Sequence, residues 1–236
     1  MFIVCYCVYF TMNKTSVIPL HIYQCWKTKD MPPNMTKAVQ AVKDSNPEFQ
    51  HHLFDDHQCR QFIAKECPKC VLAAYDRLIP GAYKADLWRL CILYKRGGIY
   101  MDIKMTPAFG FKFIELTDKE HFVRDRHPNT IYNAFMVCKP KNQFLLSCIN
   151  QIIRNVRSRY YGRDALHPTG PALLGIVRTA KHYQLNEDII HPQESGHIIY
   201  RNKRIVKISY PDYYTKERPT AGLRYNELWV QRRIYK

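Results

Sequence analysis

The sequence predicts an α/β protein, in which helices flank a sheet with parallel crossovers. In the first half of the chain, short runs rich in β-branched and aromatic residues alternate with helical patterns. This alternation is typical of parallel strands joined by helical crossovers. The 236 residues show no internal repeat and no Gly- or Ser-rich linker, so we expect a single domain over residues 17–236.

The elements of the first half follow from local patterns. Residues 17–26 are rich in β-branched and aromatic side chains and predict a strand, and residues 48–54 predict a second one. Pro32 and Pro33 open a helical segment that ends near Asp44, because proline is favoured in the first helical turn. Two short helical patterns follow at residues 56–64 and 71–78.

The longest helical pattern runs over residues 82–96, where buried apolar residues recur at spacings of three and four. It ends at Gly97 and Gly98, a C-terminal helix signal, and residues 99–103 follow as a short strand. The second half is less regular. Its expected elements are a strand at residues 131–137, helices at 144–157 and 172–183, and several short strands after Ile189.

Composition excludes a disordered or low-complexity chain, because hydrophobic residues make up 46% and charged residues 24%. The formal net charge is +16 and the isoelectric point is near 9.5. A basic excess favours anionic partners such as phosphorylated ligands, nucleic acid or acidic membranes, without choosing among them. A solvated basic face with no dedicated ligand remains the alternative.

The apolar N-terminal segment, residues 1–16, is treated as separate from the domain. Its run of apolar residues is far shorter than the ~20 residues that cross a bilayer. It lacks the basic flank and cleavage site of a signal peptide, so a buried strand, a truncated anchor and a cap on the core all stay open.

The nine cysteines show no short-period disulfide framework, and we expect reduced thiols. A zinc site within residues 51–70 is a weaker alternative, because no second ligand pair follows at finger spacing.

Candidate functional residues gather around the longest helix and the strand after it. In parallel α/β sheets, ligands lie beyond the carboxyl ends of the strands, where Trp26 and Asp102 are both expected. Asp86 and Arg89 are three positions apart on the helix, so both side chains leave from one face. A carboxylate and a guanidinium in one pocket suit a sugar and a diphosphate. For these two residues alone, an intrahelical ion pair without a ligand is the favoured interpretation.

The run from Lys84 to Lys104 resembles the donor-site core of glycosyltransferase family 32, a group of Asp-x-Asp glycosyltransferases that includes α-1,6-mannosyltransferases. The resemblance covers about residues 17–229, and residues 84–104 are its most specific part. Further segments are similar to the same family in the same order: residues 18–26, 133–140, 169–171 and, loosely, 225–229.

The resemblance implies a GT-A-like nucleotide-diphospho-sugar transferase fold, that is, a Rossmann-like mixed sheet flanked by helices. Residues 17–110 would bind the donor nucleotide, and residues 111–236 would face the acceptor. The implied reaction moves a hexose of the mannose, galactose or glucose type from a GDP- or UDP-hexose to a glycan or glycoconjugate, with retention at the anomeric carbon. The implied donor-site residues are Trp26, Asp86, Arg89, Tyr100, Asp102 and Lys104, with Arg89, Asp102 and Lys104 catalytic. Asn133, Gly170, Pro171 and Trp229 would border the sugar and the acceptor.

One departure from the family pattern concerns the metal. The family's second Asp, a ligand of a divalent cation such as Mn²⁺ or Mg²⁺, is replaced by Lys104, which leaves Asp102 as the only candidate ligand. A protonated lysine has three donors and no acceptor, so it cannot coordinate a metal. We expect instead that Lys104 places its own charge against the diphosphate.

Two other functions stay open at this point. An inactive relative would bind a sugar nucleotide or glycan without transferring it, since function depends on the site and not on the fold. A basic nucleic-acid-binding protein would use the positive charge and the Arg–Tyr-rich residues 157–163, but has no need of Asp86 and Asp102, so we expect no nucleic-acid partner. Membrane association remains open, and both the cytoplasm and the Golgi are compatible with the sequence.

Overall fold

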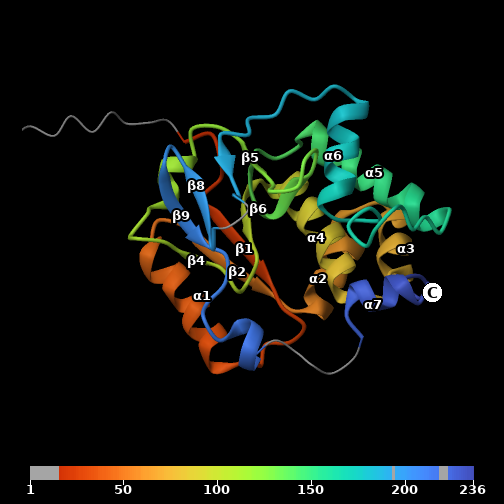
Figure 1. Ribbon diagram of the computed structural model, residues 1–236, viewed down its shortest axis with the longest axis horizontal. Helices are drawn as coiled ribbons and strands as arrows, with labels where there is room; N and C mark the ends of the chain where they lie inside the picture. The colour runs from red at the N-terminus through yellow and green to blue at the C-terminus, as the bar shows by residue number, and fades with distance from the viewer. Residues whose placement is uncertain (1–15, 193–194, 218–222) are drawn as a thin grey trace, which may run out of the picture.

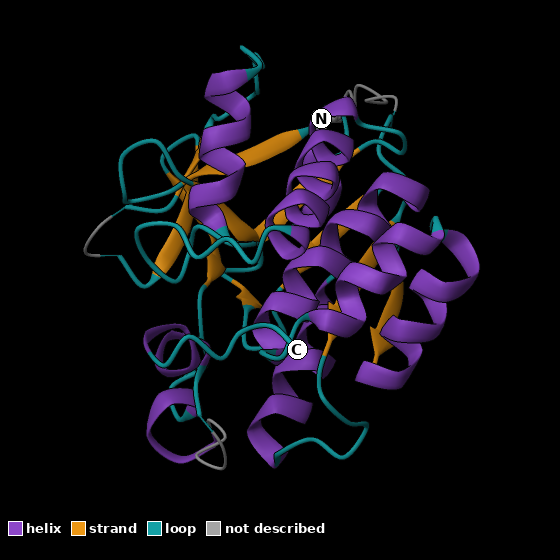
Figure 2. Cartoon of the chain, turned by 90° about the vertical axis from the view of Figure 1, so that its right-hand side faces the viewer, coloured by secondary structure: helices purple, strands orange, loops and turns teal. Residues whose placement is uncertain are grey.

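The computed structural model describes residues 16–192, 195–217 and 223–236. Its strands form one mixed sheet in the order β2-β1-β3-β6-β5-β7-β8-β9-β4. Helices α2 to α6 gather on one side of this sheet, and α1 lies on the other (Figure 1). Figure 2 shows the helical layer in front of the strands. The expected α/β architecture is therefore confirmed.

The first half follows the expected alternation. β1 pairs in parallel with both β2 and β3, which confirms the helical crossovers. The elements are β1 (His21–Cys25), α1 (Pro33–Ser45), β2 (Gln50–Phe54), α2 (Asp56–Glu66), α3 (Lys69–Arg77), α4 (Gly81–Arg96) and β3 (Gly98–Met101).

The second half contains short elements that local patterns did not predict, among them β4, β5 and α7. The helix expected to reach residue 183 ends at Ala180, and His182 adopts a left-handed φ of 52° that a helix cannot continue through. The elements are β4 (Thr106–Pro107), η1 (Phe113–Leu116), β5 (His121–Arg124), β6 (Ile131–Cys138), α5 (Gln143–Arg157), α6 (Pro171–Ala180), β7 (Ile189–Ile190), β8 (His197–Tyr200), β9 (Lys203–Lys207), η2 (Tyr213–Glu217) and α7 (Tyr225–Val230).

The core occupies both faces of the sheet because side chains alternate along each strand. On β1, Tyr23 packs with Trp88 of α4 in the cluster under the helical layer. Its neighbour Ile22 packs with Val42 of α1 and Ile99 of β3 in the cluster on the opposite face. Helix α4 is thereby held against β1 and β3, with its first turns near the carboxyl ends of these strands.

The turn between α4 and β3 depends on two glycines with positive φ. Gly97 has a φ of 65° and Gly98 a φ of 108°. A Cβ atom on Gly98 would lie 2.7 Å from the backbone oxygen of His21. Only glycine lets β3 approach β1 this closely in that conformation.

The remaining expectations concern thiols, metals and membranes. The seven cysteines in the described part of the chain are free thiols, as expected. Residues 16–192, 195–217 and 223–236 contain no group of three or more His, Cys, Asp or Glu side chains arranged to hold a metal. No helix in these ranges is both long enough and apolar enough to cross a bilayer. The apolar segment 1–16 lies outside the described residues except for Ser16.

We expect Gly98→Ala to lower the free energy of unfolding by about 1–3 kcal/mol, because alanine is strained at this φ and its Cβ meets the β1 backbone. Urea denaturation would measure the change. Gly81→Ala is the matched control, since a Cβ at Gly81 meets nothing within 4 Å. Equal midpoints for the two variants would contradict the close approach of β3 to β1.

Candidate functional site

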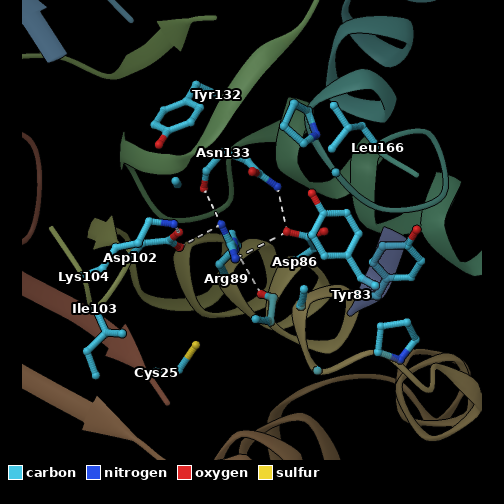
Figure 3. Close-up of a pocket in the computed structure, with 18 of the residues that line it drawn as sticks. Cys25, Tyr83, Asp86, Arg89, Asp102, Ile103, Lys104, Tyr132, Asn133 and Leu166 are labelled. Carbon is cyan, nitrogen blue, oxygen red and sulfur yellow. Dashed lines mark hydrogen bonds and ion pairs between the residues drawn. The ribbon is translucent and has the colours of Figure 1, made fainter. Parts of the chain in front are cut away.

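A cavity of about 870 Å³ opens beyond the carboxyl ends of β1 and β3. Figure 3 shows that side chains from α4, from the segment after β3 and from β6 point into it. From the first half of the chain, its lining residues fall within residues 25–27, 80–89 and 100–104, together with Asp56. From the second half they fall within residues 125–134, 165–171, 208–214 and 223–225, together with His191. A volume of this order is typical of a small-molecule site.

Arg89 lies at the centre of the polar wall and is 6% exposed. Its Nη1 is 3.3 Å from Asp102 Oδ1, and its Nη2 is 3.4 Å from Asp86 Oδ1. Nη1 also donates to the backbone oxygen of Asn133 at 2.9 Å. The guanidinium carbon lies 4.4 Å from the ring centroid of Tyr100. Burial opposes the charge of Arg89, but Tyr100 and the two carboxylates hold its pKa above the usual value.

Asp86 joins α4 to the second half of the chain. Its Oδ1 accepts from Asn133 Nδ2 at 2.9 Å, and its Oδ2 accepts from Thr169 Oγ1 at 2.7 Å. Burial raises the pKa of Asp86, although Arg89 and these hydrogen bonds act in the opposite direction. The carboxylate also lies close to the start of α6, where a Cβ on Gly170 would be 3.6 Å from Oδ2.

Asp102 and Lys104 face each other across a turn after β3, which is closed by a hydrogen bond from Met105 N to Asp102 O of 2.9 Å. Lys104 Nζ donates to Asp102 Oδ2 at 3.0 Å, and Tyr100 Oη donates to Asp102 Oδ1 at 2.9 Å. Burial alone would raise the pKa of Asp102. The positive charges of Lys104 and Arg89 have the larger effect, so the pKa lies below its usual value. Burial likewise opposes the charge of Lys104, and Asp102 raises the pKa of this ammonium above its usual value.

The residues around Asp102 do not fit a metal held by the protein. Each carboxylate oxygen of Asp102 already faces a cation, Lys104 on one side and Arg89 on the other. A divalent ion at either oxygen would have to displace one of these positive groups or lie beside it. A metal at Asp102 would therefore have one carboxylate as its ligand, and the negative charge of that carboxylate is already balanced by two cationic side chains.

Most of the residues singled out by the sequence meet at this cavity. Trp26, Asp86, Arg89, Tyr100, Asp102, Lys104, Asn133, Gly170 and Pro171 line it. Trp229 is not among the described lining residues; its Nε1 donates to the backbone oxygen of Tyr161 at 2.7 Å. The assignment of Trp229 to the acceptor side stays a prediction.

Other lining residues were not found from the sequence. They include Asp125, Tyr132 and His191, together with Tyr213 and Tyr214 of η2. Asp125 and His191 follow short strands that carry no periodic pattern, and Tyr213 and Tyr214 lie in η2. Tyr132 lies in β6, a strand that the sequence predicts, but no motif marked this residue as part of a site. The order of strands in the sheet brings Asp125, Tyr132 and His191 to the cavity.

Residues 32–123 match the family model described as "Glycosyltransferase sugar-binding region containing DXD motif". The chain is similar to inositol phosphoceramide mannosyltransferase 3 of Schizosaccharomyces pombe, with 30% identity over 169 residues, 71% of this chain and 47% of that protein. It is 34% identical over 101 residues to initiation-specific α-1,6-mannosyltransferase of Candida albicans, covering 40% of this chain and 26% of that protein. The chain spans about half the length of the first of these relatives.

Among solved structures, the PaToxG glycosyltransferase superposes with a TM-score of 0.56 at 16% sequence identity, covering 70% of this chain and 69% of that one. At this identity the likeness concerns the fold alone. The superposition confirms the GT-A-like fold that the family resemblance implied. The sequence relatives confirm the family resemblance itself.

We expect Arg89→Met to lower the free energy of unfolding by about 3–5 kcal/mol, because it leaves the buried Asp86 and the half-buried Asp102 without their shared cation. Arg89→Lys should fall between this variant and the wild type, since lysine keeps the charge but not the fork of donors. Urea denaturation would measure both. Arg60→Met, which breaks the exposed ion pair with Asp76, should leave the midpoint nearly unchanged. A similar loss in both methionine variants would contradict the central role of Arg89.

Proposed function

This chain belongs to the family of glycosyltransferases with a DXD-containing sugar-binding region, and we propose that it transfers a hexose from a nucleotide-diphosphate sugar to a hydroxyl of a glycan or glycolipid head group. The observation that carries the proposal is the convergence of Asp86, Arg89, Tyr100, Asp102 and Lys104 on one cavity. The proposal treats residues 17–236 as one catalytic domain, with residues 17–110 binding the donor and residues 111–236 facing the acceptor.

In the proposed donor complex, Asp86 and Asp102 accept hydrogen bonds from hydroxyls of the donor sugar or ribose. Arg89 and Lys104 face the diphosphate, and Trp26 packs against the base or ribose. Sugar hydroxyls both donate and accept in fixed directions, so carboxylates beside guanidinium and ammonium groups suit them. Asn133, Gly170 and Pro171 border the sugar, with Asn133 and Gly170 close to Asp86.

The donor sugar is proposed to be mannose, supplied as GDP-mannose, because the chain is similar to mannosyltransferases. The acceptor is proposed to be the inositol phosphate head group of a ceramide lipid, from the printed activity of the S. pombe relative. A net charge of +16 is consistent with work at an anionic membrane surface.

The proposed reaction proceeds with retention, as the family resemblance implies. The acceptor hydroxyl attacks the anomeric carbon on the face from which the diphosphate departs. The bond from that carbon to the phosphate oxygen breaks, and the leaving phosphate takes the proton of the attacking hydroxyl. Catalysis then depends on positioning and on stabilising the charge of the leaving group, and it needs no protein nucleophile.

Lys104 is proposed to supply the positive charge that a metal provides elsewhere in the family. Its ammonium is 3.0 Å from Asp102 Oδ2 and its side chain is 19% exposed. Tyr213 covers it, with the ring centroid 5.6 Å from Nζ. A fixed ammonium in such a partly desolvated place stabilises a developing phosphate charge without reorganising when the bond breaks.

The main experiment measures donor binding and then transfer. At about 100 times its Kd, GDP-mannose should add roughly 2.7 kcal/mol to the free energy of unfolding. Asp102→Asn should lose this stabilisation, and Asp76→Asn, at an exposed ion pair, should keep it. Transfer to vesicles that carry inositol phosphoceramide would then be assayed with radiolabelled donor.

Other outcomes would identify the competing functions. Donor binding without transfer across a panel of glycan and lipid acceptors would indicate an inactive relative. RNA binding that survives Asp86→Ala and Asp102→Ala, with no stabilisation by any sugar nucleotide, would contradict the transferase proposal.

The role of Lys104 is tested by removing metals and by restoring the family's aspartate. We expect wild-type transfer to survive exhaustive chelation. Lys104→Met should lower kcat by about 100-fold or more, the usual cost of removing one group that stabilises transition-state charge. Lys104→Asp should be inactive after chelation and should recover with Mn²⁺. Lys95→Met, at an exposed position of α4, is the matched control. Strict Mn²⁺ dependence of the wild type would contradict this role.

A further inference from the structure

A buried Asp–His pair lies in the cavity wall that the second half of the chain provides. Asp125 follows β5 and His191 follows β7, and these two strands pair in parallel, so both residues leave the sheet at the same edge. His191 Nδ1 is 3.2 Å from Asp125 Oδ1, and each side chain is 5% exposed. Both residues line the cavity. The role proposed above for the donor site uses neither.

The surroundings of Asp125 keep it an anion and an acceptor. Thr130 Oγ1 donates to its Oδ2 at 3.1 Å, and the backbone N–H of Arg126 donates to its Oδ1 at 2.8 Å. Burial opposes its charge, but the bond from His191 and these donors lower its pKa. Because Asp125 can only accept, the ring proton of His191 lies on Nδ1, which leaves a lone pair on Nε2.

Nε2 of His191 is the atom that remains for a ligand. Within residues 16–192, 195–217 and 223–236, no group is hydrogen-bonded to it, while Nδ1 is fixed by Asp125. The His191 ring packs against the ring of Tyr132, with 4.4 Å between the centroids. The Tyr132 hydroxyl points toward the part of the cavity that contains Asn133, Asp102 and Lys104 (Figure 3). Burial raises the pKa of Tyr132, so this hydroxyl stays protonated.

We propose that His191, oriented by Asp125, and Tyr132 form the subsite that holds the acceptor ring. This inference rests on the proposed function and assigns a place to its second substrate. The fitting ligand is a polyhydroxylated ring, a hexose or a cyclitol, with two neighbouring hydroxyls. His191 Nε2 accepts a hydrogen bond from the hydroxyl beside the attacking one, and Tyr132 Oη binds on the side nearer the donor.

His191 acts here by positioning the acceptor and takes no proton from it. The proton of the attacking hydroxyl passes to the leaving phosphate, as in the proposed reaction, so His191 gains no proton during the transfer. A ring held at two points presents one hydroxyl to the anomeric carbon in a fixed direction, which raises the effective concentration of that hydroxyl. The pair therefore determines which hydroxyl is glycosylated and how tightly the acceptor binds.

The fold contains a matched control for this pair. His121 and Asp188 form another Asp–His contact, with 2.7 Å between Nδ1 and Oδ1. His121 is buried there, whereas Asp188 is 31% exposed and also pairs with Lys119. Neither residue is among the described residues that line the cavity. Asp188→Asn changes the same kind of contact without touching the proposed subsite.

The experiment measures steady-state transfer by the full chain from GDP-mannose to vesicles that carry inositol phosphoceramide. Variants are His191→Ala, His191→Gln, Asp125→Asn and the control Asp188→Asn. We expect His191→Ala and Asp125→Asn to raise the acceptor KM roughly tenfold, the effect of one lost hydrogen bond to a buried partner. Asp125→Asn acts by allowing the tautomer with the proton on Nε2. His191→Gln should recover part of the loss, because its amide oxygen can accept from the same hydroxyl.

Donor binding separates the two proposals. We expect the KM for GDP-mannose, and its slow hydrolysis without acceptor, to be the same in all four variants as in the wild type. Wild-type transfer with an acceptor KM that changes less than about twofold in His191→Gln and Asp125→Asn would overturn the acceptor subsite alone. A wild-type chain that neither binds a sugar nucleotide nor transfers a sugar would overturn the proposed function, and the subsite with it.

Discussion

The guanidinium of Arg89 is buried between two carboxylates. The need to pair this buried positive charge constrains much of the surrounding structure. A charge removed from water is tolerated only when it is paired and its hydrogen bonds are satisfied. Arg89 meets that condition through Asp86 on its own helix, Asp102 after β3 and the backbone of Asn133 in β6. Asp86 in turn requires Thr169 in the loop before α6. Elements far apart in the chain are thereby held in one arrangement, and the same groups form the polar wall of the cavity.

This network also explains why a lysine can follow Asp102 where the family has an aspartate. With Arg89 and Lys104 on either side, Asp102 keeps its negative charge while the local charge stays balanced. A second carboxylate at position 104 would add a negative charge beside two existing ones and would need a divalent cation to compensate it. Under the proposed role of Lys104, side chains alone then supply the positive charge that a metal would otherwise provide.

Sequence patterns predicted the long elements of both halves, including β6, α5 and most of α6, and missed short elements of the second half, for a physical reason. α4 is long enough to show helical periodicity, and Gly97 and Gly98 mark its end. β5 has four residues and β7 has two, too few for any alternation to be read. These short strands owe their conformation to neighbours in the sheet, because an isolated segment of this length has little preference of its own.

The amino-acid sequence by itself determined the α/β class, the helix and turn that end in Gly97 and Gly98, and the identity of the charged groups between Asp86 and Lys104. All of these depend on contacts within about twenty neighbouring residues. The tertiary structure alone decided that Asn133 and Thr169 bind Asp86, that Lys104 folds back onto Asp102, and that Asp125 and His191 share a wall of the same cavity. These contacts between distant residues depend on which strands lie side by side. Strand order is set by packing over the whole sheet, so it cannot be predicted from a local pattern of residues.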